Sequence, residues 1–162
     1  MSVIPDKSRP HESERMLYDA SFCIVAAQFN AEIVDVLIAG ARTALTRHGV
    51  AASAIELVKV PGAFEVPLAA QRVARSGNFD GIVALAAVVR GGTPHFDYVS
   101  SQSIGGLGQV ALDCDIPVGN GVLTVDTMAQ ALERAGGSEG NKGEEAALAA
   151  IEMVHLLRHL DA

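Results

Sequence analysis

The sequence has few aromatic residues, no tryptophan and only two cysteines. Phe, Trp and Tyr make up 4% of the 162 residues, so the core must be built from Ala, Val, Leu and Ile, which suit closely packed layers of helices and strands. Cys23 and Cys114 are too few for a disulfide framework and form no C-x-x-C pair of the kind that binds zinc. We therefore expect two reduced thiols and no metal ion.

The sequence also lacks a long apolar run and an excess of positive charge. No apolar stretch reaches the roughly 18 residues that a membrane helix needs. The first 20 residues contain Pro5, Pro10 and many charges instead of the apolar segment of a signal peptide. The net charge of −7 argues against nucleic acid or an anionic membrane as the main partner. These absences predict a soluble, cytoplasmic protein.

Apolar strands alternate with helical segments along the chain. We expect residues 1–20 to form a flexible arm and residues 21–162 to form a single α/β domain. The predicted strands are 21–28, 55–61, 81–89 and 117–125, and the predicted helices are 31–49, 67–77, 97–114, 127–135 and 141–160. Strands that are apolar on both faces are typical of a parallel sheet covered on both sides. We therefore predict a three-layer α/β/α sandwich around a four-stranded parallel sheet, with a flavodoxin-like arrangement.

The residues after the third predicted strand have the composition of an anion site. Ligands of parallel sheets bind at the carboxyl ends of the strands. In RGGTPH, Gly91 and Gly92 leave backbone amides unobstructed and Thr93 adds a hydroxyl close to a helix start, a combination that suits a phosphate. His95 follows, and an imidazole can transfer protons near neutral pH. No P-loop or G-x-G-x-x-G pattern occurs here, and an ordinary glycine turn is the simpler interpretation of the motif taken alone.

The other strand ends carry residues that each allow two interpretations. Phe29 can stack on a flat ring, and the next residue, Asn30, is either a ligand contact or the N-cap of a helix. Glu65 is either an acceptor for a polar ligand or a first-turn residue that favours the helix dipole. Arg134 and Lys142 lie near helix ends, where a dipole role is the default, but cations beside this edge also suit an anionic substrate.

Taken together, these segments resemble the lumazine synthase family. QFN, VPGAFEVPLAA, VVRGGTPHFDYV, GVLTVDT, ERAG and GNKGEEAALAAIEM occur in the family's order between Phe22 and Arg158. The resemblance implies a transferase of riboflavin biosynthesis that needs no metal or organic cofactor. Its small-molecule substrates are 5-amino-6-(D-ribitylamino)uracil and 3,4-dihydroxy-2-butanone 4-phosphate, and its products are 6,7-dimethyl-8-ribityllumazine, phosphate and water. It also implies pentamers, which in many members build an icosahedral shell, and active sites between neighbouring subunits.

The resemblance further implies a role for each motif residue. His95 is the proton-transfer residue, and Arg134 of the adjacent subunit binds the phosphate, so these two are the expected catalytic residues. Phe29 stacks on the pyrimidine ring, and Gly92 and Thr93 hold the phosphate. The full set of expected substrate-binding residues is Phe29, Asn30, Ala63, Phe64, Glu65, Val88, Val89, Gly92, Thr93, Asn120 and Lys142.

Three features of the sequence leave alternatives open. Pro94 stiffens the approach to His95, and Asn120 stands where many family members carry a Phe that covers the ligand. A non-catalytic paralogue that binds a flavin or a lumazine is therefore the alternative to an active enzyme. The segment RAGGSEGNKG keeps the length found in shell-forming members but not the usual residues between the glycines, so the choice between a pentamer and a larger shell is open.

The arm, residues 1–20, can add to a neighbour's sheet, as similar arms do in the family.

Overall fold

The computed structural model describes residues 16–162, and a four-stranded sheet lies at the centre of this part of the chain. The strands are β1 (Phe22–Ala27), β2 (Ile55–Val60), β3 (Gly81–Val89) and β4 (Val118–Val125). They are all parallel and lie in the order β2-β1-β3-β4. β1 is buried along its whole length, and β3 is buried up to its last two residues. This burial on both faces confirms the predicted sandwich and explains why both strands are continuous apolar runs.

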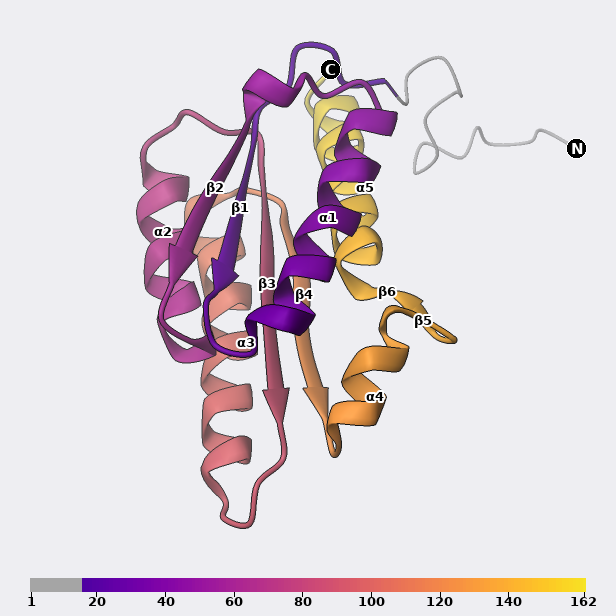
Figure 1. Cartoon of the computed structure of the whole chain (residues 1–162). Helices are drawn as coiled ribbons and strands as arrows, with labels where there is room; N and C mark the ends of the chain where they lie inside the picture. The colour runs from indigo at the N-terminus through magenta and orange to yellow at the C-terminus, as the bar shows by residue number, and fades with distance from the viewer. Residues whose placement is uncertain (1–15) are drawn as a thin grey trace, which may run out of the picture.

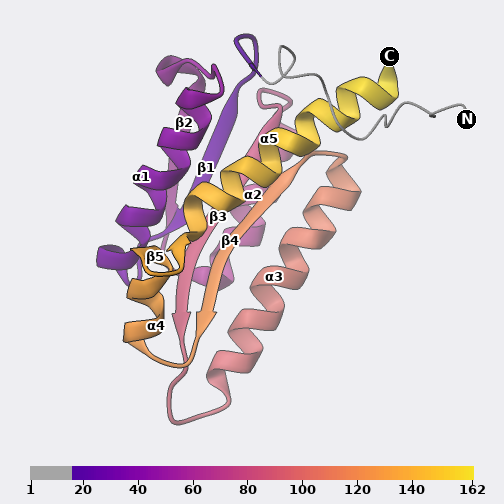
Figure 2. The ribbon, with the colours of Figure 1, turned by 90° about the vertical axis from the view of Figure 1, so that its right-hand side faces the viewer.

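Helices cover both faces of the sheet, as Figure 1 and Figure 2 show. On one face lie α1 (Ala31–Arg47) and α5 (Lys142–Asp161), which pack against each other. On the other face α2 (Val66–Arg75) packs against α3 (His95–Cys114). Each face has its own apolar cluster, and alternate residues of β3 enter one or the other: Val83 and Leu85 on the α1 side, Ile82 and Ala84 on the α2 side.

Two glycines allow α5 to lie close to its neighbours. A Cβ on Gly143 would overlap the backbone carbonyl of Leu37 in α1, and one on Gly119 in β4 would overlap the carbonyl of Ala146. Asn141 fixes the start of α5, because its Oδ1 accepts a hydrogen bond from the Glu144 amide at 3.1 Å. The position of Lys142, the first residue of this helix, is therefore set by close backbone packing.

The connection between β4 and α5 differs from the sequence-based prediction. The helix predicted over 127–135 is shorter, α4 (Met128–Glu133). The GGSEG segment, predicted as a break, belongs to a small antiparallel hairpin of β5 (Ala135–Gly137) and β6 (Gly140–Asn141). Gly136 and Gly140 adopt positive φ angles of 87° and 80°, which glycine tolerates best. The amide of Lys142 donates to the carbonyl of Arg134 at 2.8 Å across the base of this hairpin.

The predicted N-terminal arm overlaps the packed part of the chain. Residues 1–15 lie outside the described residues. The prediction that this part of the arm adds to a neighbour's sheet therefore also falls outside them. Leu17 and Ala20, each 1% exposed, belong to the core cluster under α1 and α5. The Leu17 amide donates to the carbonyl of His48 at 2.7 Å. Residues 17–20 thus pack with the domain and not apart from it. Within residues 16–162, no helix combines the length and hydrophobicity required to span a bilayer.

Candidate active site

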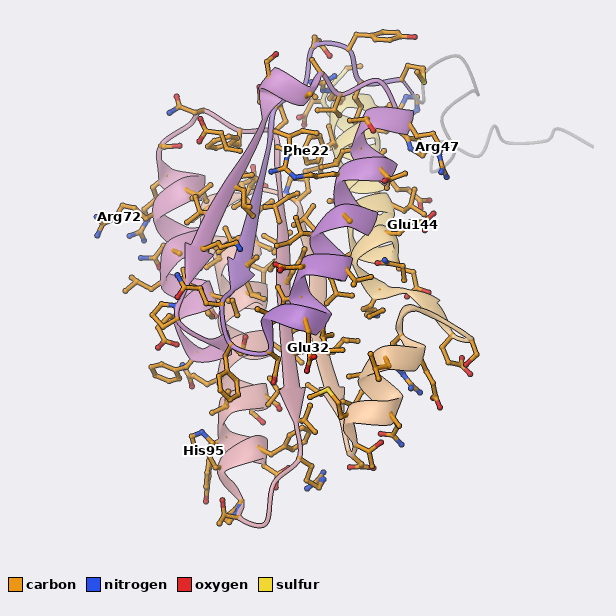
Figure 3. All side chains as sticks on the ribbon, in the orientation of Figure 1. Phe22, Glu32, Arg47, Arg72, His95 and Glu144 are labelled. Atoms are coloured by element: carbon orange, nitrogen blue, oxygen red, sulfur yellow. The ribbon has the colours of Figure 1, made fainter. Side chains whose placement is uncertain are left out.

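The carboxyl ends of the four strands meet at one edge of the sheet, and His95 lies at this edge (Figure 3). A cavity of about 630 Å³ opens there between the ends of β1, β2 and β3 and the start of α3. It brings together the segments after the first three strands. The predicted site residues that line it are Phe29, Ala63, Phe64, Glu65, Val88, Val89, Thr93 and His95.

Two aromatic side chains stand in the open part of this cavity. Phe29 is 72% exposed and Phe64 is 60% exposed, although the chain has only five phenylalanines in all. The Phe29 amide donates to the carbonyl of Pro61 at 3.1 Å, which continues the β1–β2 pairing beyond the strands and holds the two segments side by side. Exposed rings inside a cavity provide a flat apolar surface that can stack against a planar ligand.

Asn30 has a different position from the other predicted binding residues. It occupies the N-cap position of α1 with φ of 58°, a left-handed conformation that Asn tolerates, and its side chain makes no capping hydrogen bond. The side-chain amide instead donates to the carbonyl of Ala87 in β3 at 2.8 Å. Asn30 therefore connects the end of β1 to Ala87 of β3, a residue that lines the cavity.

The loop from Gly91 to Pro94 is exposed and leads directly into α3. Pro94 is the N-cap residue with φ of −69°, and its carbonyl accepts hydrogen bonds from the amides of Asp97 at 3.0 Å and Tyr98 at 3.4 Å. The fixed φ of proline suits this position, so Pro94 starts the helix instead of distorting it. The helix begins at His95, two residues before the predicted start, and this places the imidazole on its first turn.

Gly92 lies in the exposed loop and is not part of the His95 cavity lining. A second cavity, of about 400 Å³, holds three further predicted residues. Asn120, Arg134 and Lys142 line it together with Glu139 and Glu145. Arg134 Nη1 donates to the carbonyl of Gln130 at 3.1 Å and pairs with Glu133 at 3.3 Å. In one chain the structure therefore does not bring Arg134 and Lys142 to the His95 cavity.

The family model described as 6,7-dimethyl-8-ribityllumazine synthase matches residues 19–158. The chain belongs to the lumazine synthase family. A 6,7-dimethyl-8-ribityllumazine synthase from Halorhodospira halophila (strain DSM 244 / SL1) is 55% identical to it over 146 residues, which cover 90% of this chain and 94% of that protein. Both comparisons confirm the family predicted from the motifs.

Two further residues of the lumazine synthase motifs lie at or beside this cavity and were not among the predicted site residues, Arg90 and Phe96. Phe96 lines the His95 cavity and is only 9% exposed. The Arg90 guanidinium lies over the Phe96 ring, with Cζ 4.4 Å from the ring centroid. Its Nε donates to Asp126 Oδ1 at 2.8 Å, and this hydrogen bond is the main cause of a raised pKa for Arg90. The sequence does contain a feature that points to Arg90, because it is a cation that directly follows a predicted buried strand.

Among residues 16–162, no group of His, Cys, Asp and Glu side chains has an arrangement that suits a metal ion. The two cysteines are free thiols, Cys23 buried in β1 and Cys114 partly buried at the end of α3. The side chains that line the His95 cavity include its imidazole and the rings of Phe29, Phe64 and Phe96.

Proposed function

We propose that this lumazine synthase family member carries out its reaction in the cavity beside His95. The enzyme condenses 5-amino-6-(D-ribitylamino)uracil with 3,4-dihydroxy-2-butanone 4-phosphate and releases 6,7-dimethyl-8-ribityllumazine, phosphate and water. The observation that carries the proposal is the convergence of an aromatic wall, an anion-binding loop and an imidazole on one cavity at the carboxyl edge of the sheet.

The pyrimidine substrate occupies the part of the cavity between Phe29 and the end of β3. Stacking on Phe29 fixes the plane of the ring. β3 continues past β1, since its pairing with β1 ends at Leu85 while its pairing with β4 continues to Val89. The edge of β3 that faces away from β4 therefore offers backbone groups at Val88 and Val89 to the ring. Glu65, which is exposed, accepts hydrogen bonds from the ribityl hydroxyls.

The phosphate of the second substrate binds at the loop before α3. Among residues 16–162, the amides of Gly91, Gly92 and Thr93 have no hydrogen-bond acceptor. A Cβ on Gly91 or Gly92 would meet no atom within 4 Å, so packing inside the described chain does not demand glycine at either position. The 20-residue helix α3 starts immediately afterwards and adds the positive end of its dipole.

The chemistry requires proton transfer and charge neutralisation more than a cofactor. An imine forms between the amine of the pyrimidine and the carbonyl of the butanone, and phosphate is then eliminated. His95 moves protons in these steps as general acid and base, while the loop and a cation stabilise the departing phosphate. Holding two substrates in contact supplies much of the remaining rate enhancement.

The complete site forms between two copies of the chain. Arg134 and Lys142 line a cavity apart from His95, so a neighbouring copy brings its Arg134 to the phosphate and its Lys142 to the pyrimidine. Exposed apolar side chains on the α2–α3 face, Leu68 at 66% and Tyr98 at 73% exposed, support burial against such a neighbour. We propose a pentamer, alone or within a larger shell, which light scattering measures directly.

Free thiols at Cys23 and Cys114 fit a reducing, cytoplasmic environment.

The direct test is to incubate the purified protein with both substrates and to follow the fluorescence of the lumazine product. We expect product and phosphate to appear in equal amounts. A protein that binds riboflavin or a lumazine tightly but forms no product would contradict the catalytic proposal and would favour a binding paralogue.

A further inference from the structure

A single side chain, that of Arg90, spans the loop that we assign to the phosphate. The backbone of Arg90 is fixed where β3 ends, because its amide donates to the carbonyl of Val125 at 2.8 Å. Its side chain then reaches across the loop to the first turn of α3. There it lies over the ring of Phe96 at 4.4 Å, and its Nη1 is 3.6 Å from Asp97 Oδ1. Arg90 thus connects the residue before the loop with the residues after it.

The loop has few other constraints of its own. Residues 91–94 are exposed, and the amides of Gly91, Gly92 and Thr93 lack an acceptor within residues 16–162. Two glycines in sequence increase the number of backbone conformations available to such a loop. The contacts of Arg90 limit this freedom by fixing the separation of the loop's two ends.

The same arginine also connects the loop to the segment that carries Arg134. Arg90 Nε donates to Asp126 Oδ1 at 2.8 Å, directly after β4. The Asp126 amide donates to Gln130 Oε1 at 2.7 Å, and the carbonyl of Gln130 accepts from Arg134 Nη1 at 3.1 Å. This chain of contacts joins the two phosphate-binding elements of one subunit, which serve two different active sites in the proposed assembly.

We propose that Arg90 is a positioning residue that holds the loop of residues 91–94 in its phosphate-binding conformation. The proposal rests on the function proposed above. Arg90 stands outside the lining of the His95 cavity, and its guanidinium is occupied by Asp126, Asp97 and Phe96. It therefore acts through the loop and not by contact with the phosphate. A preformed loop lowers the entropy that is lost when the phosphate binds.

Positioning and overall stability can be separated at this site. The side chains of Arg90 and Asp126 are 48% and 64% exposed, and exposed ion pairs contribute little to the free energy of unfolding. Loss of the Arg90 contacts should therefore change substrate binding while leaving the melting temperature nearly the same.

The test compares steady-state kinetics of Arg90→Ala with those of the unaltered enzyme. We expect the KM for the butanone phosphate to rise about ten-fold, as for a loss of ground-state binding, while the KM for the pyrimidine changes less than about two-fold. Arg90→Lys should recover part of the affinity, because an ammonium can pair with one carboxylate but lacks the planar fork that reaches both. The matched control is Arg47→Ala, an exposed arginine that pairs with Glu144 at 3.8 Å on the opposite face (Figure 3) and should leave both KM values unchanged.

Asp126→Asn distinguishes positioning from direct contact with the phosphate. If Arg90 positions the loop, weakening its anchor at Asp126 raises the KM for the phosphorylated substrate. If Arg90 itself binds the phosphate, releasing it from Asp126 leaves this KM the same or lowers it, which would overturn the proposal. An unchanged KM in Arg90→Ala, or equal increases for both substrates, would also overturn it. Should Arg90→Ala fail to fold, Asp126→Asn and Arg90→Lys still decide the question.

If the proposed function is wrong, the unaltered protein will form no lumazine from the two substrates, a result that differs from every outcome above. Titration with inorganic phosphate then tests the positioning role without turnover. Weaker phosphate binding by Arg90→Ala than by the unaltered protein would support it, and equal binding would contradict it.

Discussion

At the scale of single residues, His95 combines exposure with a fixed backbone. It is the first residue of a 20-residue helix, and Pro94 accepts the first hydrogen bonds of that helix. The imidazole lines the cavity without a hydrogen-bonding partner among residues 16–162. The proposed proton-transfer role suits a side chain of this kind, which is exposed while its backbone is held in place.

We expect His95→Ala to slow turnover without abolishing it. Proton transfer by a positioned side chain contributes roughly 10²-fold or more, whereas the holding of two substrates together does not depend on the imidazole. The measurement is kcat with both substrates saturating, and the KM values should change little. A complete loss of turnover with intact binding of both substrates would show that the imidazole does more than transfer protons.

The two thiols should differ strongly in reactivity. Burial, with a smaller contribution from Glu56, raises the pKa of Cys23 to about 12, so almost no thiolate exists at neutral pH. Cys114 is partly buried. We expect iodoacetamide at pH 8 to label Cys114 first in the native protein and to label both after denaturation, as followed by mass spectrometry of the peptides. Equal native rates would contradict the burial of Cys23.

At the scale of elements, the strands could be predicted closely and the connections could not. β1 and β3 are continuous apolar runs bounded by polar residues, and the change from apolar to polar residues indicates where each strand begins and ends. The hairpin of β5 and β6 has no apolar alternation, since its two short strands contain only alanine, glycine and asparagine. The start of α3 was predicted two residues late, because the sequence alone does not show that Pro94 is the N-cap.

Eight of the expected site residues line one cavity because each stands at the end of a strand or follows one in sequence, whereas Phe96, on the first turn of α3, was not expected there. The Arg90–Asp126 contact joins residues 36 positions apart, and no local pattern indicates such a pairing. The separation of Arg134 from His95 within one chain is likewise a three-dimensional fact. The resemblance implies that Arg134 reaches the phosphate from an adjacent subunit.

The docking of α5 should be sensitive to one added methyl group. In Gly143→Ala the new Cβ would overlap the carbonyl of Leu37, so α5 must shift away from α1. Forcing extra volume into a packed contact costs roughly 1–3 kcal/mol, which urea unfolding measures. The control is Gly105→Ala in α3, where a Cβ meets no atom within 4 Å and helix propensity favours alanine. Equal effects of the two changes would contradict the close packing.

At the scale of the whole molecule, the separation of the two cavities leads us to expect that one subunit contributes His95 and its neighbour contributes Arg134 to each complete site. Arg134→Ala should raise the KM for the butanone phosphate more than the KM for the pyrimidine, because in the proposed site the guanidinium binds the phosphate. Equal changes would contradict this assignment. A homogeneous assembly of either Arg134→Ala or His95→Ala contains only impaired sites.

Mixed assemblies of the two variants should regain activity. When His95→Ala and Arg134→Ala chains are unfolded together and refolded in equal amounts, about a quarter of the heterologous interfaces in a ring join two intact half-sites. We expect activity above that of either variant alone, measured at low butanone phosphate. Activity equal to the average of the separate variants would show that each site lies within one chain.

The hairpin between Arg134 and Lys142 should tolerate inserted residues. Its base is closed by the hydrogen bond from the Lys142 amide to the Arg134 carbonyl at 2.8 Å, so the spacing of the two cations is set at the base and not by the number of residues in between. Ser138, at the exposed tip, is therefore a place where inserted residues would leave both cations where they are. A peptide displayed there would extend from the hairpin without altering the positions of Arg134 and Lys142.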